Sequence, residues 1–184
     1  DSQGLCFVGK ISLPDFLRQK LKTKQGGVFE ITAPSNRTFE TIKTDTLENL
    51  EKLSAPFHFE PSMGKKVGNH QGAHFYTIGQ RKGLGIGGTP LPLFVIGTDV
   101  ESNTIYVGQG DEHWGLHRPA WKISEKEINW IRRDKELAEN TSMKVDARIR
   151  YRQNLQKATL INKEGHYFMV FEEMQRGITP GQFA

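Results

Sequence analysis

The sequence predicts a mainly β protein with a few short helices. From Met143 to Arg152, apolar and charged residues alternate, which is the pattern of a strand with one face on a core and the other in solvent. Two pairs of apolar runs are separated by short turn sequences, Glu101-Ser102-Asn103 and Lys163-Glu164-Gly165, as in β-hairpins. The 184 residues are 36% hydrophobic and 25% charged, values typical of a globular protein with one or two cores.

In the first half of the chain, two helices are expected among short strands. Ser12, Pro14 and Asp15 favour a helix start, and this helix should end near Lys24, before two glycines. A second helix is expected over 46–53, where three leucines recur at helical spacing. The other elements expected here are strands over 28–31, 73–78, 93–100 and 104–109, a loop over 55–69 and a Gly-rich loop over 79–88.

The second half of the chain has the pattern of a small barrel or sandwich. A linker is expected first, over 113–119. The strands expected after it cover 143–152, 157–161 and 166–172. We therefore expect two domains. The first, over 1–114, is β-rich and begins with the segment that carries the single cysteine, and the second, over 115–184, is a β-barrel domain.

Positive charge is gathered in two stretches of the sequence. The net charge of +4 is compatible with a nucleic-acid partner but does not establish one. No acidic residue lies over 61–98, a range that includes Arg81 and Lys82. The second stretch consists of three arginines that alternate along one predicted strand, Arg148, Arg150 and Arg152. Like charges on one strand face repel one another, and RNA phosphate would relieve this repulsion; a solvated face is the alternative.

The Gly-rich loop contains a formal G-x-G-x-x-G pattern at Gly83, Gly85 and Gly88. A dinucleotide fingerprint of this kind has to open a helix, and Pro90 and Pro92 argue against a helix here. The same objection weakens an S-adenosylmethionine site, and the Gly-Lys-Ser/Thr sequence of a phosphate loop is absent. Two interpretations stay open: a flexible basic loop that approaches an RNA backbone closely, or a long connection between strands.

Cys6 is the only cysteine, so the chain forms no internal disulfide, and a reducing cytoplasm is the expected location. A buried structural cysteine is the default interpretation. The flanking Gly4 and Gly9, with a lysine next to them, would instead allow a reactive thiolate presented to a ligand. His70 and His74 have no acidic or thiol ligand close in sequence, so no metal site is expected. No apolar run is long enough to span a membrane.

Five motifs follow one another along the chain. They are Asp1-Ser2-Gln3-Gly4-Leu5-Cys6-Phe7, Gly68-Asn69-His70-Gln71-Gly72, Tyr76-Thr77-Ile78-Gly79-Gln80-Arg81-Lys82-Gly83-Leu84-Gly85, Arg150-Tyr151-Arg152-Gln153 and Thr179-Pro180-Gly181-Gln182. In this order and at this spacing, they resemble the tRNA-specific 2-thiouridylases over nearly the whole chain. Five ordered motifs make the resemblance far more specific than any one of them.

The resemblance implies both a fold and a reaction. Members of the family use ATP to replace the C2 oxygen of the tRNA wobble uridine with sulfur. An N-terminal ATP pyrophosphatase domain, expected upstream of Asp1, would bind the ATP, and no cofactor is expected in this chain. A β-rich central domain would follow, and then a β-barrel similar to the second domain of elongation factor Tu, here without its last strands.

The resemblance also implies site residues. Cys6 matches the cysteine that bears the persulfide, and a sulfur-donor or sulfur-relay protein would load it. The expected tRNA-binding residues are Arg150, Tyr151 and Gln182 by this match, and Arg148, Arg152, Arg81 and Lys82 by their charge and position.

Alone, this chain is expected to bind tRNA weakly and not to thiolate it, because the ATP site and a partner cysteine would lie upstream. Two other interpretations stay open. One is a non-catalytic RNA-binding module like those of translation factors, in which the cysteine is inert. The other, with less support, is a tRNA methyltransferase. The stretch 33–62 looks longer than the family usually has between these motifs, and the sequence assigns it no role.

Overall fold

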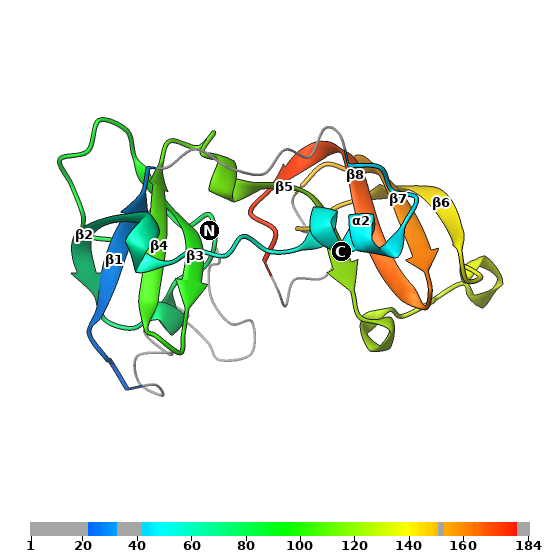
Figure 1. Cartoon of the computed structure of the whole chain (residues 1–184), viewed down its shortest axis with the longest axis horizontal. Helices are drawn as coiled ribbons and strands as arrows, with labels where there is room; N and C mark the ends of the chain where they lie inside the picture. Colours follow the sequence, from blue (N-terminus) through cyan, green and yellow to red (C-terminus); the bar gives the residue numbers. More distant parts are fainter. Residues whose placement is uncertain (1–21, 33–41, 151–152, 180–184) are drawn as a thin grey trace. The chain divides into compact units, whose positions relative to one another are not determined.

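The structure, a computed structural model of the chain, describes residues 22–32, 42–150 and 153–179. It is mainly β, which confirms the predicted fold class (Figure 1). The strands are β1 (Gly26–Ile31), β2 (Gly64–His70), β3 (Leu93–Asp99), β4 (Thr104–Gln109), β5 (His117–Ile123), β6 (Thr141–Ala147), β7 (Gln156–Lys163) and β8 (His166–Arg176). The described ranges also contain the helix α2 (Leu47–Ser54) and 3₁₀ turns at Pro61–Met63, Ala73–Phe75, Trp114–Leu116, Glu125–Glu127 and Arg133–Lys135.

Contacts group the described residues into two compact units. The first comprises 22–32 and 59–111, and the second comprises 42–58, 112–150 and 153–179. One domain is expected over 1–114, whereas α2 and the residues around it group with the second unit.

In the first unit, the described strands form a sheet in the order β2-β1-β4-β3. β3 and β4 are the predicted hairpin, paired antiparallel from Leu93 opposite Gln109 to Asp99 opposite Thr104. The strand predicted over 28–31 is β1, which runs parallel to β4 and antiparallel to β2. These strand predictions are confirmed.

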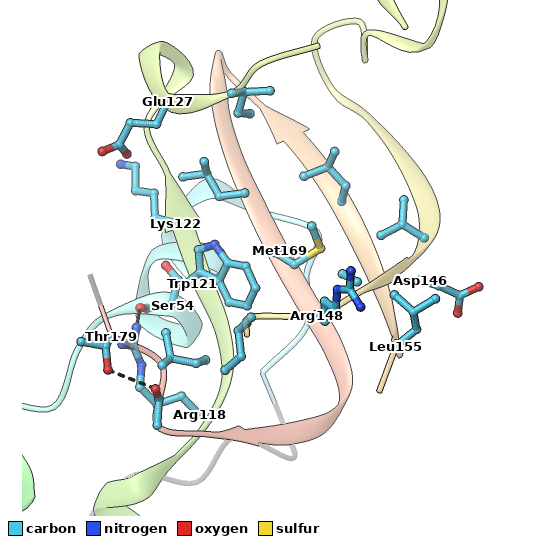
Figure 2. A pocket seen from close by; sticks show the side chains of 18 of the residues that line it. Ser54, Arg118, Trp121, Lys122, Glu127, Asp146, Arg148, Leu155, Met169 and Thr179 are labelled. Carbon is cyan, nitrogen blue, oxygen red and sulfur yellow. Dashed lines mark hydrogen bonds between the residues drawn. The ribbon is translucent and has the colours of Figure 1, made fainter. Parts of the chain in front are cut away.

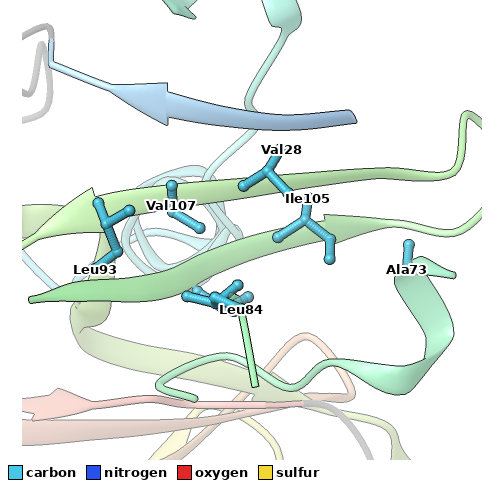
Figure 3. Close-up of a cluster of buried hydrophobic side chains, with 7 residues drawn as sticks. Val28, Ala73, Leu84, Leu93, Ile105 and Val107 are labelled. Carbon is cyan, nitrogen blue, oxygen red and sulfur yellow. The ribbon is translucent and has the colours of Figure 1, made fainter. Parts of the chain in front are cut away.

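The core of the first unit lies against one face of this sheet. Val28, Ile105 and Val107 of the strands are fully buried. Figure 3 shows them close to Leu84, which comes from the Gly-rich loop, and to Ala73, which comes from a 3₁₀ turn. Because Leu84 is only 6% exposed, the Gly-rich loop closes one side of the core.

Two elements of the first unit differ from the sequence prediction. β2 lies in the stretch expected to be a loop, because Gly64 and Gly68 weaken its strand signal while they permit close packing. A Cβ at Gly64 would lie 2.2 Å from the carbonyl oxygen of Glu30. The strand predicted over 73–78 is wrong. A 3₁₀ turn begins there after Gly72 (φ 143°), so its apolar side chains reach the core from a turn.

In the second unit, the described strands form an antiparallel sheet in the order β5-β8-β7-β6. The hairpin of β7 and β8 is confirmed, and Glu164 (φ 51°) and Gly165 (φ 76°) supply the left-handed residues of its turn. β5 begins at His117, so the linker expected over 113–119 is shorter than predicted. In the described ranges β5 does not pair with β6, and the sheet is open rather than closed into a barrel.

The helix α2 covers one face of the second sheet (Figure 1). The Thr46 hydroxyl accepts the N–H of Asn49 at 3.2 Å and caps the helix, which confirms the predicted helix start. Leu50 is fully buried against Ile161 of β7 and Phe168 of β8. The other face of the sheet carries a second cluster, which includes Met169, Phe171 and Leu160.

The helix expected over residues 12–24 lies outside the described residues except at its end, where residues 22–25 are not helical. Cys6 precedes this helix and also lies outside the described ranges. In the part of the chain that is described, no helix combines the length and the apolar character needed to cross a membrane.

Candidate functional site

The predicted site residues fall into three groups. Arg81 and Lys82 lie in the Gly-rich loop of the first unit, and Arg148 and Arg150 lie in the second unit. The third group lies outside the described residues and consists of Cys6, Tyr151, Arg152 and Gln182.

Arg148 and Arg150 lie in a turn that follows β6. The strand ends at Ala147, so the prediction that a strand carries the two arginines is wrong, although both are exposed on either side of the buried Ile149, as the alternation predicts. The side chain of Ile149, 5% exposed, packs in the same core as Val145 and Ala147, so the alternation of burial continues past the end of the strand. The N–H of Gln153 donates to the Arg150 carbonyl at 3.0 Å, and this bond closes a turn where a strand was expected. We call residues 148–150 together with Gln153 the arginine turn.

Hydrogen bonds join the arginine turn to the end of β8 and the residues after it. The guanidinium of Arg150 donates to the carbonyl of Gly177 at 3.1 Å. The side-chain amide of Gln153 donates to the side-chain oxygen of Gln175 at 2.7 Å, and Gln175 is buried. The structure therefore brings Arg150 next to the segment that precedes Gln182 in the chain.

The guanidinium of Arg150 is placed to bind an anion. Arg150 is exposed, and among the described residues it forms no ion pair with a carboxylate. A guanidinium has five N–H donors in a planar fork that matches phosphate, so one contact with a carbonyl leaves most donors available. Its partner Gly177 (φ 71°) is fixed in turn, because its N–H donates to the Leu116 carbonyl at 2.7 Å. Arg150 is thus held on a fixed backbone.

A cavity of about 990 Å³ lies on the open face of the second sheet, beside the arginine turn. Figure 2 shows Trp121 and Met169 near its centre, with Lys122, Glu127 and Arg148 among the polar side chains around them. Apolar side chains of this lining also form the core on that face. Among the residues that the structure describes, no three or more side chains gather as metal ligands. The cavity is the apolar hollow of an open sheet.

Hydrogen bonds hold the Gly-rich loop against the first sheet. The N–H of Gly79 donates to the Val95 carbonyl at 2.7 Å, and the N–H of Val95 donates to the Gln80 carbonyl at 2.9 Å. The side chain of Gln80 accepts the N–H of Thr77 at 3.2 Å and donates to the Lys82 carbonyl at 2.9 Å. These bonds, together with Leu84 in the core, hold the Gly-rich loop in one conformation. The loop is therefore not the flexible one that the sequence allows.

The same loop presents two cations to solvent. Arg81 and Lys82 are both exposed, while the hydroxyl of Tyr76 donates to the carbonyl of Gly83 next to them at 3.2 Å. Gly83 has φ 88°, a left-handed conformation that glycine adopts without strain. The loop is therefore both a connection between strands and a fixed basic surface that a phosphate backbone can approach.

Three polar residues help to organise these regions, and the sequence assigns none of them a role: Asn103 and Gln175, which are buried, and Gln153, which is half-buried. Asn103 has φ 52° and lies in the β3–β4 turn, where an asparagine is a usual residue, so its position has a local signal. Its side chain accepts the N–H of Ala73 and donates to the Lys24 carbonyl, both at 3.0 Å. Such partners are far away in sequence, and no local pattern indicates them.

Two protein-family descriptions match the chain. Residues 55–109, which include β2, β3 and β4, match the tRNA methyl transferase PRC-barrel domain. Residues 121–184, which include β6, β7 and β8, match the aminomethyltransferase beta-barrel domain.

Curated relatives match the chain over its whole length. A protein of Christiangramia forsetii named tRNA-specific 2-thiouridylase MnmA is 49% identical, and the match covers 100% of this chain and 47% of that protein. Proteins of the same name are 48% identical in Flavobacterium johnsoniae, with 100% and 47% covered, and 34% identical in Shouchella clausii, with 99% and 40% covered. The chain thus spans about half the length of the curated relatives that it matches.

Proposed function

Because the chain belongs to the tRNA-specific 2-thiouridylase family, we propose that it is part of an enzyme that places sulfur on C2 of the wobble uridine in tRNA. The observation that carries this proposal is the similarity, over the whole chain, to relatives of that name. One matching family description mentions methyl transfer, but these relatives are named for thiolation. In the described structure, the G-x-G-x-x-G pattern does not open a helix, so a methyltransferase is not proposed.

The proposed chemistry requires activation of the uridine before sulfur transfer. The C2 oxygen is a poor leaving group, so ATP adenylates it and pyrophosphate is released. The terminal sulfur of a Cys6 persulfide then bonds to C2, and the oxygen leaves with AMP. A second cysteine attacks the Cys6 sulfur, the S–S bond to the uridine sulfur breaks, and the two cysteines end as a disulfide that a thiol must reduce. We assign ATP binding and this second cysteine to parts of the whole protein outside this chain.

A second protein is proposed to load Cys6 with sulfur. A persulfide requires a sulfur atom already at the oxidation level of a disulfide, which a sulfur-donor or sulfur-relay protein would supply by exchange. Because Cys6 must be a free thiol before it accepts sulfur, and free thiols persist in a reducing compartment, we propose the cytoplasm as the location, in agreement with the single cysteine of the chain.

We assign tRNA binding to two basic surfaces, one in each unit. The first is the exposed pair Arg81 and Lys82 on the fixed Gly-rich loop. The second is the arginine turn, where Arg150 has most of its donors available. The full set proposed to contact tRNA is Arg81, Lys82, Arg148, Arg150, Tyr151, Arg152 and Gln182. Contacts of this kind act mainly on phosphates, so they position the tRNA and make its binding depend on salt.

The substitution Cys6→Ser in the full-length protein tests this function. We expect no 2-thiouridine in tRNA incubated with ATP and a persulfide donor, measured by mass spectrometry of the digested tRNA, while tRNA binding is unchanged. The wild-type protein should also carry a persulfide that is lost from the variant. If wild type forms no 2-thiouridine and its Cys6 neither reacts with alkylating reagents nor carries a persulfide, the protein is a non-catalytic RNA-binding module instead.

A further inference from the structure

We infer that Gln153 is a positioning residue for tRNA binding, an inference that rests on the proposed function. Gln153 holds the arginine turn so that the guanidinium of Arg150 is presented to a phosphate. Gln153 itself is not assigned a contact with tRNA. Its role is to act through Arg150, and three hydrogen bonds of the described structure carry the inference.

Three hydrogen-bonding groups of Gln153 have partners in the second unit: the backbone N–H and both polar atoms of the side chain. Its backbone N–H donates to the Arg150 carbonyl at 3.0 Å. Its side-chain Oε1 accepts the N–H of Ile149 at 3.1 Å. Its side-chain Nε2 donates to Oε1 of Gln175 at 2.7 Å. The first two bonds close a small ring around Arg150, and the third ties this ring to β8.

The chemistry of these bonds requires a glutamine. The Ile149 N–H can only donate, so it needs the oxygen of the carboxamide, which leaves the NH₂ group for Gln175. Gln175 is 4% exposed, and its own NH₂ group donates to the Glu173 carbonyl at 3.0 Å, so its oxygen is left to accept. A glutamate at position 153 would lack the donor, and a methionine of similar shape would lack both groups.

Arg150 is held at its backbone and at its side chain. Its carbonyl accepts from Gln153, and its guanidinium donates to the Gly177 carbonyl at 3.1 Å. Both partners connect the turn to the end of β8 and the residue after it. A side chain held in this way loses less conformational freedom when it binds a phosphate, which strengthens binding without any additional contact. Loss of the Gln153 bonds should therefore weaken the contact that Arg150 makes, even though the cation itself remains.

A double-mutant cycle in the full-length protein tests this role. We expect Arg150→Met to weaken tRNA binding by about tenfold and Gln153→Met by about fivefold, while the double variant is no weaker than Arg150→Met alone, because residues that act through one contact are not additive. The plot of the logarithm of the association constant against the logarithm of the salt concentration has a negative slope. We expect its magnitude to decrease by about 0.7 to 0.9 in Arg150→Met, and by a smaller amount in Gln153→Met. KM for tRNA should rise, and kcat at saturating tRNA should stay unchanged.

The controls separate positioning from general loss of structure. Gln156→Met is the matched control, since within the described ranges the side-chain amide of Gln156 donates to the nearby Asn154 carbonyl alone; this variant should bind tRNA as wild type does. A purely structural role would lower the active fraction of Gln153→Met without changing the salt slope, and this result would overturn the inference. If Gln153→Met does not fold, Gln175→Met removes the acceptor of the bond between the two glutamine side chains. It then replaces Gln153→Met in the double-mutant cycle with Arg150→Met.

The outcomes also distinguish this inference from the proposed function. If Arg150→Met binds tRNA as tightly as wild type, the assignment of the arginine turn to tRNA is wrong, and the role of Gln153 is wrong with it. If Arg150→Met weakens binding but Gln153→Met does not, or if the two effects add in full, only the positioning role is wrong.

Discussion

Two buried polar residues, His70 and Asn103, join separate parts of the first unit. Nε2 of His70 faces the Asn103 carbonyl at 3.2 Å and therefore donates, so Nδ1 carries no proton and accepts the N–H of Gly72 at 2.9 Å. The side chain of Asn103 bonds to the backbone of Lys24 and Ala73. Both ring nitrogens of His70 thus have protein partners, which makes His70 a structural residue of this unit in its neutral form.

The neutral state of His70 predicts a dependence of stability on pH. Burial lowers the pKa of His70 because desolvation disfavours the charged ring. With a folded pKa below the unfolded value of about 6.5, the contribution to stability is complete above about pH 6.5 and is lost as the pH falls toward and through the folded pKa. We expect the melting temperature, measured by circular dichroism, to fall as the buffer is acidified below that value.

The variant His70→Gln isolates this effect from the other five histidines. It should be less stable than wild type at neutral pH, because its amide reproduces the two hydrogen bonds of the ring imperfectly. Its melting temperature should also vary less with pH, so that the two curves converge in acid. Parallel curves across the whole range would contradict a role for His70 in the pH dependence.

At the scale of elements, the local sequence pattern predicts the strands of the two hairpins but not β2 or the end of β6. The hairpins β3–β4 and β7–β8 combine apolar strands with turn residues, and both signals lie in adjacent sequence. β2 has no such signal, because Gly64 and Gly68 are required by close packing with other parts of the unit. The alternation of β6 continues in sequence to Arg152, but the strand ends at Ala147, because Gln153 bonds back to Ile149 and Arg150 and closes a turn.

Substitutions at three glycines of the first unit test this account of β2. A Cβ at Gly64 would meet backbone, the Glu30 carbonyl oxygen at 2.2 Å, which cannot move without disrupting the sheet. At Gly68 it would meet the side chain of Ile86 at 2.9 Å, which can shift. Gly87 has open space around it and no left-handed φ. We expect Gly64→Ala to lower the free energy of unfolding by about 2–4 kcal/mol, Gly68→Ala by about 1 kcal/mol, and Gly87→Ala by less than about 0.5 kcal/mol.

Urea unfolding followed by circular dichroism measures these three values, and Gly87→Ala serves as the control for the loss of glycine alone. The order of the three variants is the sharper expectation, because it depends on which atom the added Cβ meets. A Gly64→Ala variant as stable as Gly87→Ala would mean that β2 does not pair with β1 in the way described.

At the scale of the whole molecule, the sequence indicates a family, whereas the way in which the arginine turn is built cannot be predicted from it. The motifs that resemble the family are local; one contains Cys6, and another contains Arg150 and Gln153. The bonds that build the arginine turn join residues far apart in sequence: Arg150 and Gly177 are 27 positions apart, and Gln153 and Gln175 are 22 apart. No periodicity or turn signal reports such pairs, so the prediction extended a strand where the structure has a tied turn.

The division into two units, each with its own core, predicts the behaviour of the isolated chain. We expect it to fold and to bind tRNA weakly, because each unit carries exposed cations, yet to form no 2-thiouridine, because ATP binding is proposed to lie elsewhere in the whole protein. Filter binding over a series of salt concentrations should give a linear fall of log K with log salt. Arg150→Met is the matched variant and should reduce the slope. Binding that does not respond to salt would contradict the phosphate contacts. ATP-dependent thiolation by the isolated chain would contradict the proposal that ATP binds elsewhere in the whole protein.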